Sequence, residues 1–449
     1  MPLDVDPRAV PVLLLYNVDP SWEASEREDV VAVTNQLLHA IADIGHPSAS
    51  VPLFGDNMQE VMEPYGRTEY IVFNWCESIP GRPHSEPQVA RELESMGFTF
   101  TGAGSTALDL ACDKRRVKKV LEESGIPTPS WRLYVRPERN LWGRYPAIVK
   151  AANEHCSEGI TRESVVMTEQ ELLERVSYII DAYHQPALVE DFIDGREFHV
   201  SLWGNGRIEM LPPAEMDFSL FSDFHDRLCT HDSKCVPGSL HYEGIQTLLP
   251  APLSGEELQA LGKVCMSAYM AVGCRDYGRL DVRSRDGVYY VLDVNPNADI
   301  SADASLACAA EIAGYSYGQA GSRIVRLAAR PHRVTASGEP GLTGTRPWRG
   351  PSPEFEEFVA QRFEILAFLS QQSLDQAVVP VHDGIEFLGG LGLVLVRQGR
   401  DPCLHLLAPG MEPADLIEGD EVPGGEVDVS LEQVREPDQE RARIGVAQV

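Results

Sequence analysis

Features that would assign this 449-residue sequence to a membrane or secreted protein are absent from it. No run of about 18 apolar residues occurs, so the sequence predicts no membrane-spanning helix. Segment 1–6 contains acidic residues and no basic one, whereas a secretory signal peptide begins with basic residues. We therefore expect a soluble, cytoplasmic protein without a membrane partner.

Positive charge and paired cysteines are also scarce. The 38 lysines and arginines are outnumbered by 68 aspartates and glutamates, giving a formal net charge of -30. Such a chain repels nucleic acids, so we expect no nucleic-acid partner, and any anionic substrate needs locally placed cations or a metal ion. The nine cysteines include no Cys-x-x-Cys pair, so neither a disulfide framework nor a zinc site is indicated.

Short apolar runs alternate with helical patterns over roughly residues 9–110. Buried strands are predicted at 12–16, 51–54 and 70–74. Between them, the apolar residues of 26–44 recur at helical spacing. This alternation is typical of a parallel α/β domain.

The later part of the chain contains segments of contrasting composition. Residues 218–248 form a long polar stretch, which in a compact domain is more often a functional flap than a connector. Residues 335–353 are rich in Gly, Pro, Ser and Thr and predict a linker. Beyond it we expect a small acidic region with one helix at 354–371 and disorder after about residue 418.

A predicted hairpin brings polar residues together. On two strands joined by a turn at 285–287, alternation places Arg279 and Asp281 on one face, and Asp293 and Asn295 share a face of the return strand. Carboxylate and amide oxygens of this kind suit Mg²⁺ together with a nucleotide phosphate. The alternative is the solvated face of an ordinary hairpin.

Two further segments fit a nucleotide. Lys150 ends an apolar strand and precedes a turn of small residues, so its charge and the turn's N–H groups can bind phosphate; the alternative is a strand-end lysine that reaches solvent. The apolar residues of 188–193 can line an adenine slot, with Glu197 at the ribose hydroxyls; the alternative is a polar turn between strands.

Several motifs occur together in an order that resembles the ATP-grasp superfamily, and within it the D-alanine–D-alanine ligase branch, across roughly residues 10–330. The order of the motifs is more specific than any one of them. They are Thr101-Gly102-Ala103-Gly104-Ser105 before Asp113-Lys114, Gly125-Ile126-Pro127-Thr128-Pro129, Ile148-Val149-Lys150, Val189-Glu190, Gly195-x-Glu197-Phe198, Gly278-Arg279-Leu280-Asp281 and Asp293-Val294-Asn295.

The resemblance implies a mixed α/β (α+β) fold in three segments, with ATP between two antiparallel sheets. The expected segments are an N-terminal substrate domain at 1–112, a central lid at 113–213, a metal-binding domain at 214–334 with the flap 218–248, a linker at 335–353 and a small acidic region of unknown role at 354–449. It also implies small-molecule substrates and, as an option, a homodimer.

Roles follow for the residues that match the motifs. The implied nucleotide contacts are Lys114, Lys150, Ser157, Glu190 and Glu197. The implied ligands of two Mg²⁺ ions, with Mn²⁺ as an alternative, are Asp281, Asp293 and Asn295. The implied catalytic groups are Arg279, which would stabilise a tetrahedral intermediate, the flap residue Lys234, and Glu26.

The family reaction begins when a carboxylate attacks the γ-phosphate of ATP, and an amine then displaces phosphate from the acyl phosphate. One further feature matches the family pattern and two depart from it. Glu26 resembles the family's anchor for an amine, although a helix N-terminus also favours acids. The His-Gly segment of D-alanine ligases is absent. Asp299 stands in the segment that receives a substrate carboxylate in the family, and an aspartate repels a carboxylate but attracts an amine.

We therefore predict an ATP-dependent carboxylate–amine ligase that forms an amide or peptide bond on an amino acid in a specialised biosynthetic pathway. One alternative is a D-alanine–D-alanine ligase of cell-wall synthesis. An alternative of another class is a catalytically silent ATP-binding regulatory or scaffold protein.

Overall fold

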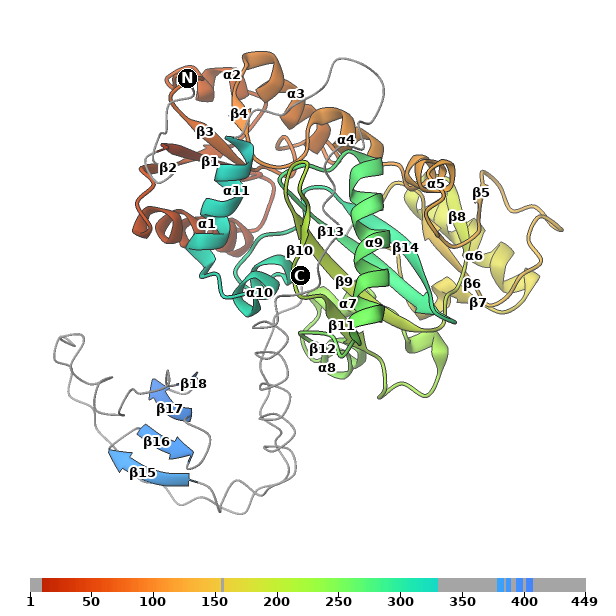
Figure 1. Ribbon diagram of the computed structural model, residues 1–449. Coiled ribbons are helices and arrows are strands. Elements are labelled where there is room, and N and C mark those ends of the chain that lie inside the picture. The colour runs from red at the N-terminus through yellow and green to blue at the C-terminus, as the bar shows by residue number, and fades with distance from the viewer. Residues whose placement is uncertain are drawn as a thin grey trace. The chain divides into compact units, whose positions relative to one another are not determined.

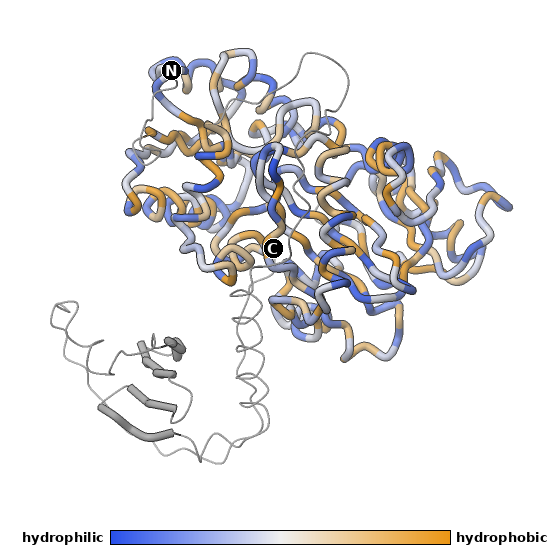
Figure 2. Tube along the Cα trace, in the orientation of Figure 1, coloured by the Kyte–Doolittle hydropathy of each residue, from blue (hydrophilic) through white to orange (hydrophobic). Residues whose placement is uncertain are grey.

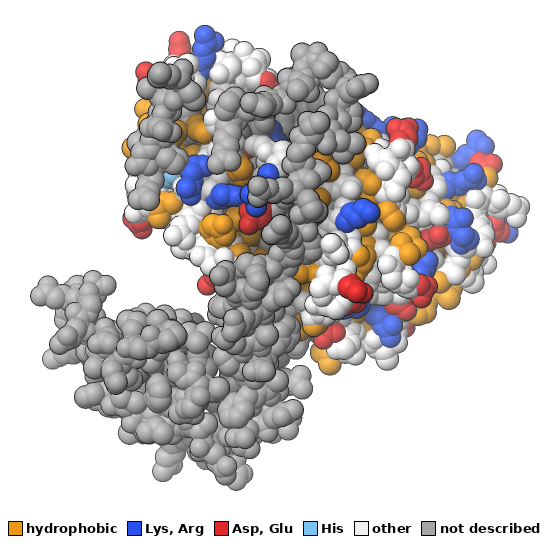
Figure 3. Space-filling view, in the orientation of Figure 1, with side chains coloured by type: hydrophobic (Ala, Val, Ile, Leu, Met, Phe, Trp, Pro, Cys, Tyr) orange, Lys and Arg blue, Asp and Glu red, His pale blue; other side chains and the backbone are white. Residues whose placement is uncertain are grey.

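The computed structural model describes residues 10–154, 157–329 and four strands between 378 and 406 (Figure 1). The chain divides into two compact units, the first spanning residues 1–346 and 445–449 and the second residues 347–444. None of the described helices has the length and apolar character needed to cross a bilayer. On the face shown in Figure 3, basic and acidic side chains of the first unit are interspersed.

A parallel sheet forms the N-terminal part of the first unit. In the order β2-β1-β3-β4, its strands span Ser48–Leu53, Val12–Asn17, Ile71–Trp75 and Thr99–Phe100. The helices between and after them are α1 (Ala24–Asp43), α2 (Met58–Met62), α3 (Glu86–Met96) and α4 (Ser105–Ala111). The central strand β1 is buried along its whole length, which explains its unbroken apolar sequence. The predicted parallel α/β arrangement is confirmed.

Two later helices, α10 (Ser305–Ile312) and α11 (Tyr317–Ala328), complete this layer, and α11 lies against α1 (Figure 1). A Cβ atom on Gly318 of α11 would lie only 2.1 Å from the carbonyl oxygen of Ala40 in α1, so glycine allows this close approach. Residues far apart in sequence therefore share one core.

A small antiparallel sheet forms the central part of the unit. In the order β5-β8-β6-β7, its strands span Trp131–Tyr134, Ala187–Asp191, Ala147–Ala151 and Val165–Val166. Before it lies α5 (Lys114–Glu123), and between its strands lie the short 3-10 helix η1 (Arg162–Ser164) and α6 (Glu169–Tyr183). The apolar side of α6 packs on the sheet, as the helical spacing of its apolar residues predicts.

A larger antiparallel sheet carries the polar hairpin. In the order β12-β11-β9-β13-β14, its strands span Gln246–Leu248, Ala214–Asp217, Arg196–Trp203, Tyr277–Arg285 and Val288–Asn295, and β10 (Glu209–Met210) pairs with β9. Helix α9 (Gly255–Val272) covers one face, where alternate strand residues such as Val200 and Leu280 are fully buried. The amphipathic character of such helices is visible as alternating colours along the tube in Figure 2. Alternation leaves the other face of β9, β13 and β14 polar.

The predicted flap, residues 218–248, is largely irregular but contains short helices that the sequence did not predict. They are η2 (Phe224–Asp226), α7 (Asp232–Cys235) and α8 (Leu240–Gly244). Phe218, Phe221 and Ile245 are buried with the apolar residues of β11, which fixes the two ends of the flap on the large sheet.

The second unit contains a four-stranded antiparallel sheet in sequential order. Its strands are β15 (Val378–His382), β16 (Ile385–Leu388), β17 (Leu393–Gln398) and β18 (Asp401–Leu406). The expected linker 335–353, the helix 354–371 and the disorder after about residue 418 lie outside the described residues.

Candidate active site

Register places the polar residues of the hairpin opposite one another. Asp281 of β13 pairs with Asp293 of β14, and Arg279 pairs with Asn295. On the other side of β13, His199 of β9 lies opposite Asp281. Because paired residues of neighbouring strands project on the same face, these side chains form one polar surface, as alternation predicts.

The two aspartates of this surface have basic neighbours. Arg279 donates from Nε to Oδ1 of Asp281 over 2.9 Å, and Lys114 Nζ lies 3.3 Å from Oδ2 of Asp293. Burial by itself would raise the pKa of Asp281, but the positive charges around it, first that of Arg279, hold the pKa below its ordinary value. Asp281 is therefore ionised at neutral pH.

The donor set fits a hard divalent cation. Asp281 and Asp293 supply carboxylate oxygens from adjacent strands, and Asn295 can add an amide oxygen. The amide nitrogen of Asn295 is buried and has no hydrogen-bond partner among the described residues.

Lysines lie beside a buried glutamate in the central part of the unit. The carboxylate of Glu190 is within 2.7 Å of Lys118 Nζ and 2.6 Å of Lys150 Nζ, in ion pairs rather than well-aligned hydrogen bonds. Burial alone would raise the pKa of Glu190, but the charges of Lys118 and then Lys150 outweigh it and hold the pKa at about 2. The sequence analysis missed Lys118, although it lies one helical turn after Lys114.

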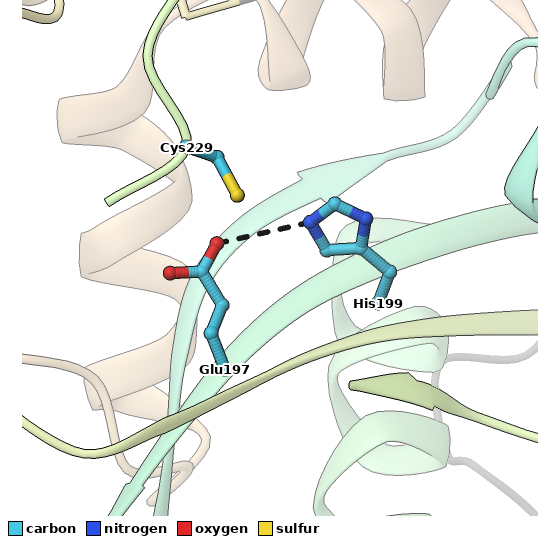
Figure 4. A group of neighbouring side chains, drawn as sticks. All are labelled: Glu197, His199 and Cys229. Carbon is cyan, nitrogen blue, oxygen red and sulfur yellow. Dashed lines mark ion pairs between the residues drawn. The ribbon is translucent and has the colours of Figure 1, made fainter. Parts of the chain in front are cut away.

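Glu197 also has a cationic partner. Arg283 donates from Nε to Oε2 of Glu197 over 2.6 Å, and its guanidinium lies 4.8 Å from the ring centre of Phe192. The other oxygen of Glu197 faces Nε2 of His199 at 3.7 Å, beside Cys229 of the flap (Figure 4). Side chains two residues apart on a strand share a face, so Arg283 could have been assigned to the face of Arg279, and His199 to the face of Glu197. No feature of the sequence identified Cys229.

Family comparisons agree with this geometry. Residues 121–326 match the model of the D-Ala D-Ala ligase C-terminus. A D-alanine–D-alanine ligase of Halorhodospira halophila is 30% identical over 257 residues, which are 56% of this chain and 78% of that protein. The chain belongs to the D-alanine–D-alanine ligase family.

Other matches refine this family assignment. The uncharacterized protein y4sG of Sinorhizobium fredii is 32% identical over 272 residues, 60% of this chain and 77% of its own length. The crystal structure of a D-alanine–D-alanine ligase from Bacillus anthracis, complexed with ATP, superposes with a TM-score of 0.56 at 18% identity, covering 72% of this chain and 98% of that one. This likeness supports the ATP-grasp fold. The protein is an ATP-dependent ligase, and its family uses ATP, a divalent metal and small-molecule substrates.

Three other predicted residues of the ligase lie on α1, in a turn of the central part and on the flap. Glu26 is exposed at the start of α1, where its carboxylate accepts from the N–H of Glu23 in a capping box. Ser157 has a positive φ of 60° in the turn before Gly159. Lys234 lies on α7 in the flap, and its charge acts on Asp281. The helix-terminus alternative for Glu26 thus has a structural basis.

An acidic cluster formed by Glu77, Glu86 and Asp299 lies near the end of β14, where the chain meets α3. Asn297 joins the two parts, because its Nδ2 donates to Glu86 over 2.9 Å and its Oδ1 accepts from the N–H of Ala103. The charge of Asp299 raises the pKa of Glu77, after the larger effect of burial, and burial raises that of Glu86 to about 8. Oδ2 of Asp299 is buried without a partner. None of these three acids forms an ion pair with a lysine or arginine of the described residues.

Proposed function

We propose that this ligase joins the carboxylate of one small molecule to the amine of another, with MgATP, and that at least one substrate is an amino acid other than D-alanine. The carboxylate attacks the γ-phosphate, giving an acyl phosphate and ADP, and the amine then displaces inorganic phosphate. The observation that carries this proposal is the surface formed by Asp281, Asp293, Asn295, Arg279 and Lys114, which has donors for a metal beside cations for phosphate.

Each side chain then has a role in binding or in stabilising charge. A Mg²⁺ ion held by the two aspartates and Asn295 would neutralise phosphate oxygens. Lys114 and Lys150 would bind phosphate as point charges. Arg279, fixed by Asp281, would stabilise the negative charge that develops when the amine attacks the acyl phosphate.

The assignment of Glu190 changes in the light of its contacts. Both its oxygens are occupied by Lys118 and Lys150 in a nearly fully buried cluster, so we propose that Glu190 positions Lys150 and that the backbone of β8, rather than this carboxylate, meets the adenine. Glu197 remains the proposed ribose contact, oriented by Arg283.

The acidic cluster supports a substrate other than D-alanine in the acceptor position. The charge of Asp299 would repel a carboxylate entering beside it and attract an ammonium group, and an ammonium group there would also favour the ionised forms of Glu77 and Glu86, whose pKa values are raised. We propose that the molecule bound there presents a cationic amine. We also propose the homodimer that the family resemblance implies.

The test is ADP release from MgATP with D- and L-amino acids and amines, singly and in pairs, followed by mass spectrometry. A product lighter than the summed substrates by one water, formed from a pair that includes a cationic amine, is expected. Stimulation by D-alanine alone, with D-alanyl-D-alanine as product, would instead identify a cell-wall ligase, for which the family relatives are the supporting observation.

A further inference from the structure

A second cluster of potential metal ligands lies beside the proposed nucleotide site. Glu197 and His199 project from β9 on the same face, and Cys229 approaches them from the flap (Figure 4). One ligand atom from each residue lies within 4.8 Å of the other two. Glu197 and His199 are buried, and Cys229 is partly buried.

The chemistry of this cluster differs from that of the hairpin. Asp281, Asp293 and Asn295 offer only oxygen, which suits a hard cation such as Mg²⁺. A thiol, an imidazole and a carboxylate offer sulfur, nitrogen and oxygen, which is a ligand set of zinc. Three protein ligands leave a fourth tetrahedral position for water or for a ligand atom of a bound molecule.

We propose that Glu197, His199 and Cys229 bind a Zn²⁺ ion that links the flap to the large sheet. On binding, the Cys229 thiol loses its proton to solvent and the thiolate bonds to zinc. Zn²⁺ with one thiolate and one carboxylate is a neutral unit, and binding raises the net charge of the buried site by one, because Zn²⁺ enters and one proton leaves. The ligand atoms must close by a small movement of the flap, because zinc ligands stand about 2.0–2.3 Å from the ion.

The surroundings of Glu197 are compatible with a bound cation. Arg283 occupies only Oε2, while Oε1 faces His199, so the carboxylate can bridge the arginine and the metal. Hydrogen bonds of this kind orient ligating carboxylates in metal sites. The guanidinium has additional acceptors in the carbonyl oxygens of Ile193 and Arg227, which support its charge when Glu197 is shared.

A consequence for the enzyme follows if Glu197 binds ribose, as proposed above. Zinc and ATP would then compete for the same carboxylate, and zinc would hold the flap in a nucleotide-free state. This competition rests on the proposed function, whereas the zinc site itself does not. Zinc binding and its competition with ATP are therefore measured separately.

The direct test uses the full-length, metal-free protein without nucleotide, titrated with Co²⁺ as a spectroscopic probe of the zinc site. We expect a thiolate-to-cobalt charge-transfer band that saturates at one equivalent and disappears when Zn²⁺ is added. Cys229→Ser should abolish the band. The matched control is Cys308→Ser, because the Cys308 thiol donates to the backbone carbonyls of Ala302 and Asp303 and is not part of the cluster, and this variant should keep the band.

A second variant covers the case in which Cys229→Ser fails to fold, judged by its circular dichroism and thermal unfolding. In a chelator competition assay, His199→Gln should weaken Zn²⁺ binding by about 10–100-fold. A band that persists in the folded Cys229→Ser variant, or unchanged Zn²⁺ affinity in His199→Gln, would overturn the site. Zn²⁺ binding without competition from ATP would instead keep the site and refute the ribose role of Glu197.

Discussion

Removal of the Glu190 carboxylate should strongly destabilise the first unit. In Glu190→Gln, the ammonium groups of Lys118 and Lys150 would lose the negative charge that lies 2.6–2.7 Å from each of them. The side chains of Glu190 and Lys118 are each only 1% exposed, and that of Lys150 is 11% exposed, so water cannot replace the missing charge. Removing one partner of a buried pair costs about 3–5 kcal/mol, and we expect a loss in that range.

The size of the effect should depend on pH in a defined direction. The pKa of Glu190 is lowered from its ordinary value of 4.5 to about 2 in the folded protein. Its ionised form therefore contributes stability that is complete above pH 4.5 and is lost as the pH falls towards 2. The difference in unfolding free energy between the parent protein and Glu190→Gln should accordingly shrink over that interval.

Urea unfolding followed by circular dichroism measures both effects. Glu138→Gln is the matched control, because Glu138 makes an exposed ion pair with Arg136 at 3.2 Å, and such pairs contribute about 0–1 kcal/mol. A loss below about 1 kcal/mol in Glu190→Gln would mean that a lysine releases its proton instead of remaining charged. The ion-pair account of this cluster would then be wrong.

Three further predictions concern the active site. Asp293→Ala should lower ADP release by about 100-fold or more, because a metal ligand is lost. The control is Glu256→Ala, which should retain activity because Glu256 is exposed. Normal turnover in Asp293→Ala would contradict the metal assignment. Gly195→Ala should lower the melting temperature and weaken ATP binding, because the added Cβ would lie 1.9 Å from a carbonyl oxygen of β13. The control is Gly255→Ala, because Gly255 has open space around it. Equal melting temperatures of the two variants would refute the close approach. Asp299→Asn should raise KM for the amine and leave KM for ATP unchanged, and the reverse pattern would exclude the acidic cluster from amine binding.

Local periodicity predicted much of the fold and of the metal-binding face. The hairpin of β13 and β14 follows from alternation and a short turn, so Arg279 and Asp281 could be assigned to one face before any tertiary structure was known. The partner strand β9 is remote in sequence, and its pairing with β13 could not be deduced from either segment. For this reason His199 and the Arg283–Glu197 pair were missed.

Contacts that depend on the path of irregular backbone were least predictable. Cys229 reaches Glu197 only because the two ends of the flap are fixed by buried apolar residues, and a single cysteine has no sequence spacing that indicates a ligand. Conversely, the local capping pattern at Glu26 was visible in the sequence, but it could not show whether the carboxylate also meets a substrate.

Charge separation within the site gives a physical reason for substrate orientation. Lys114, Lys118 and Lys150 lie on the side that we propose binds the nucleotide. Glu86 and Asp299 lie beyond the end of β14 without an ion-paired lysine or arginine among the described residues. In a chain with a formal charge of -30, such a group of cations must be maintained by specific ion pairs, and Glu190 and Asp293 supply them. A carboxylate would be drawn towards the lysines and an ammonium group towards the acids. The carboxylate would therefore lie next to the γ-phosphate. The amine, once deprotonated, would attack the carbonyl carbon of the acyl phosphate from the side of the acids, which is the arrangement that amide formation requires.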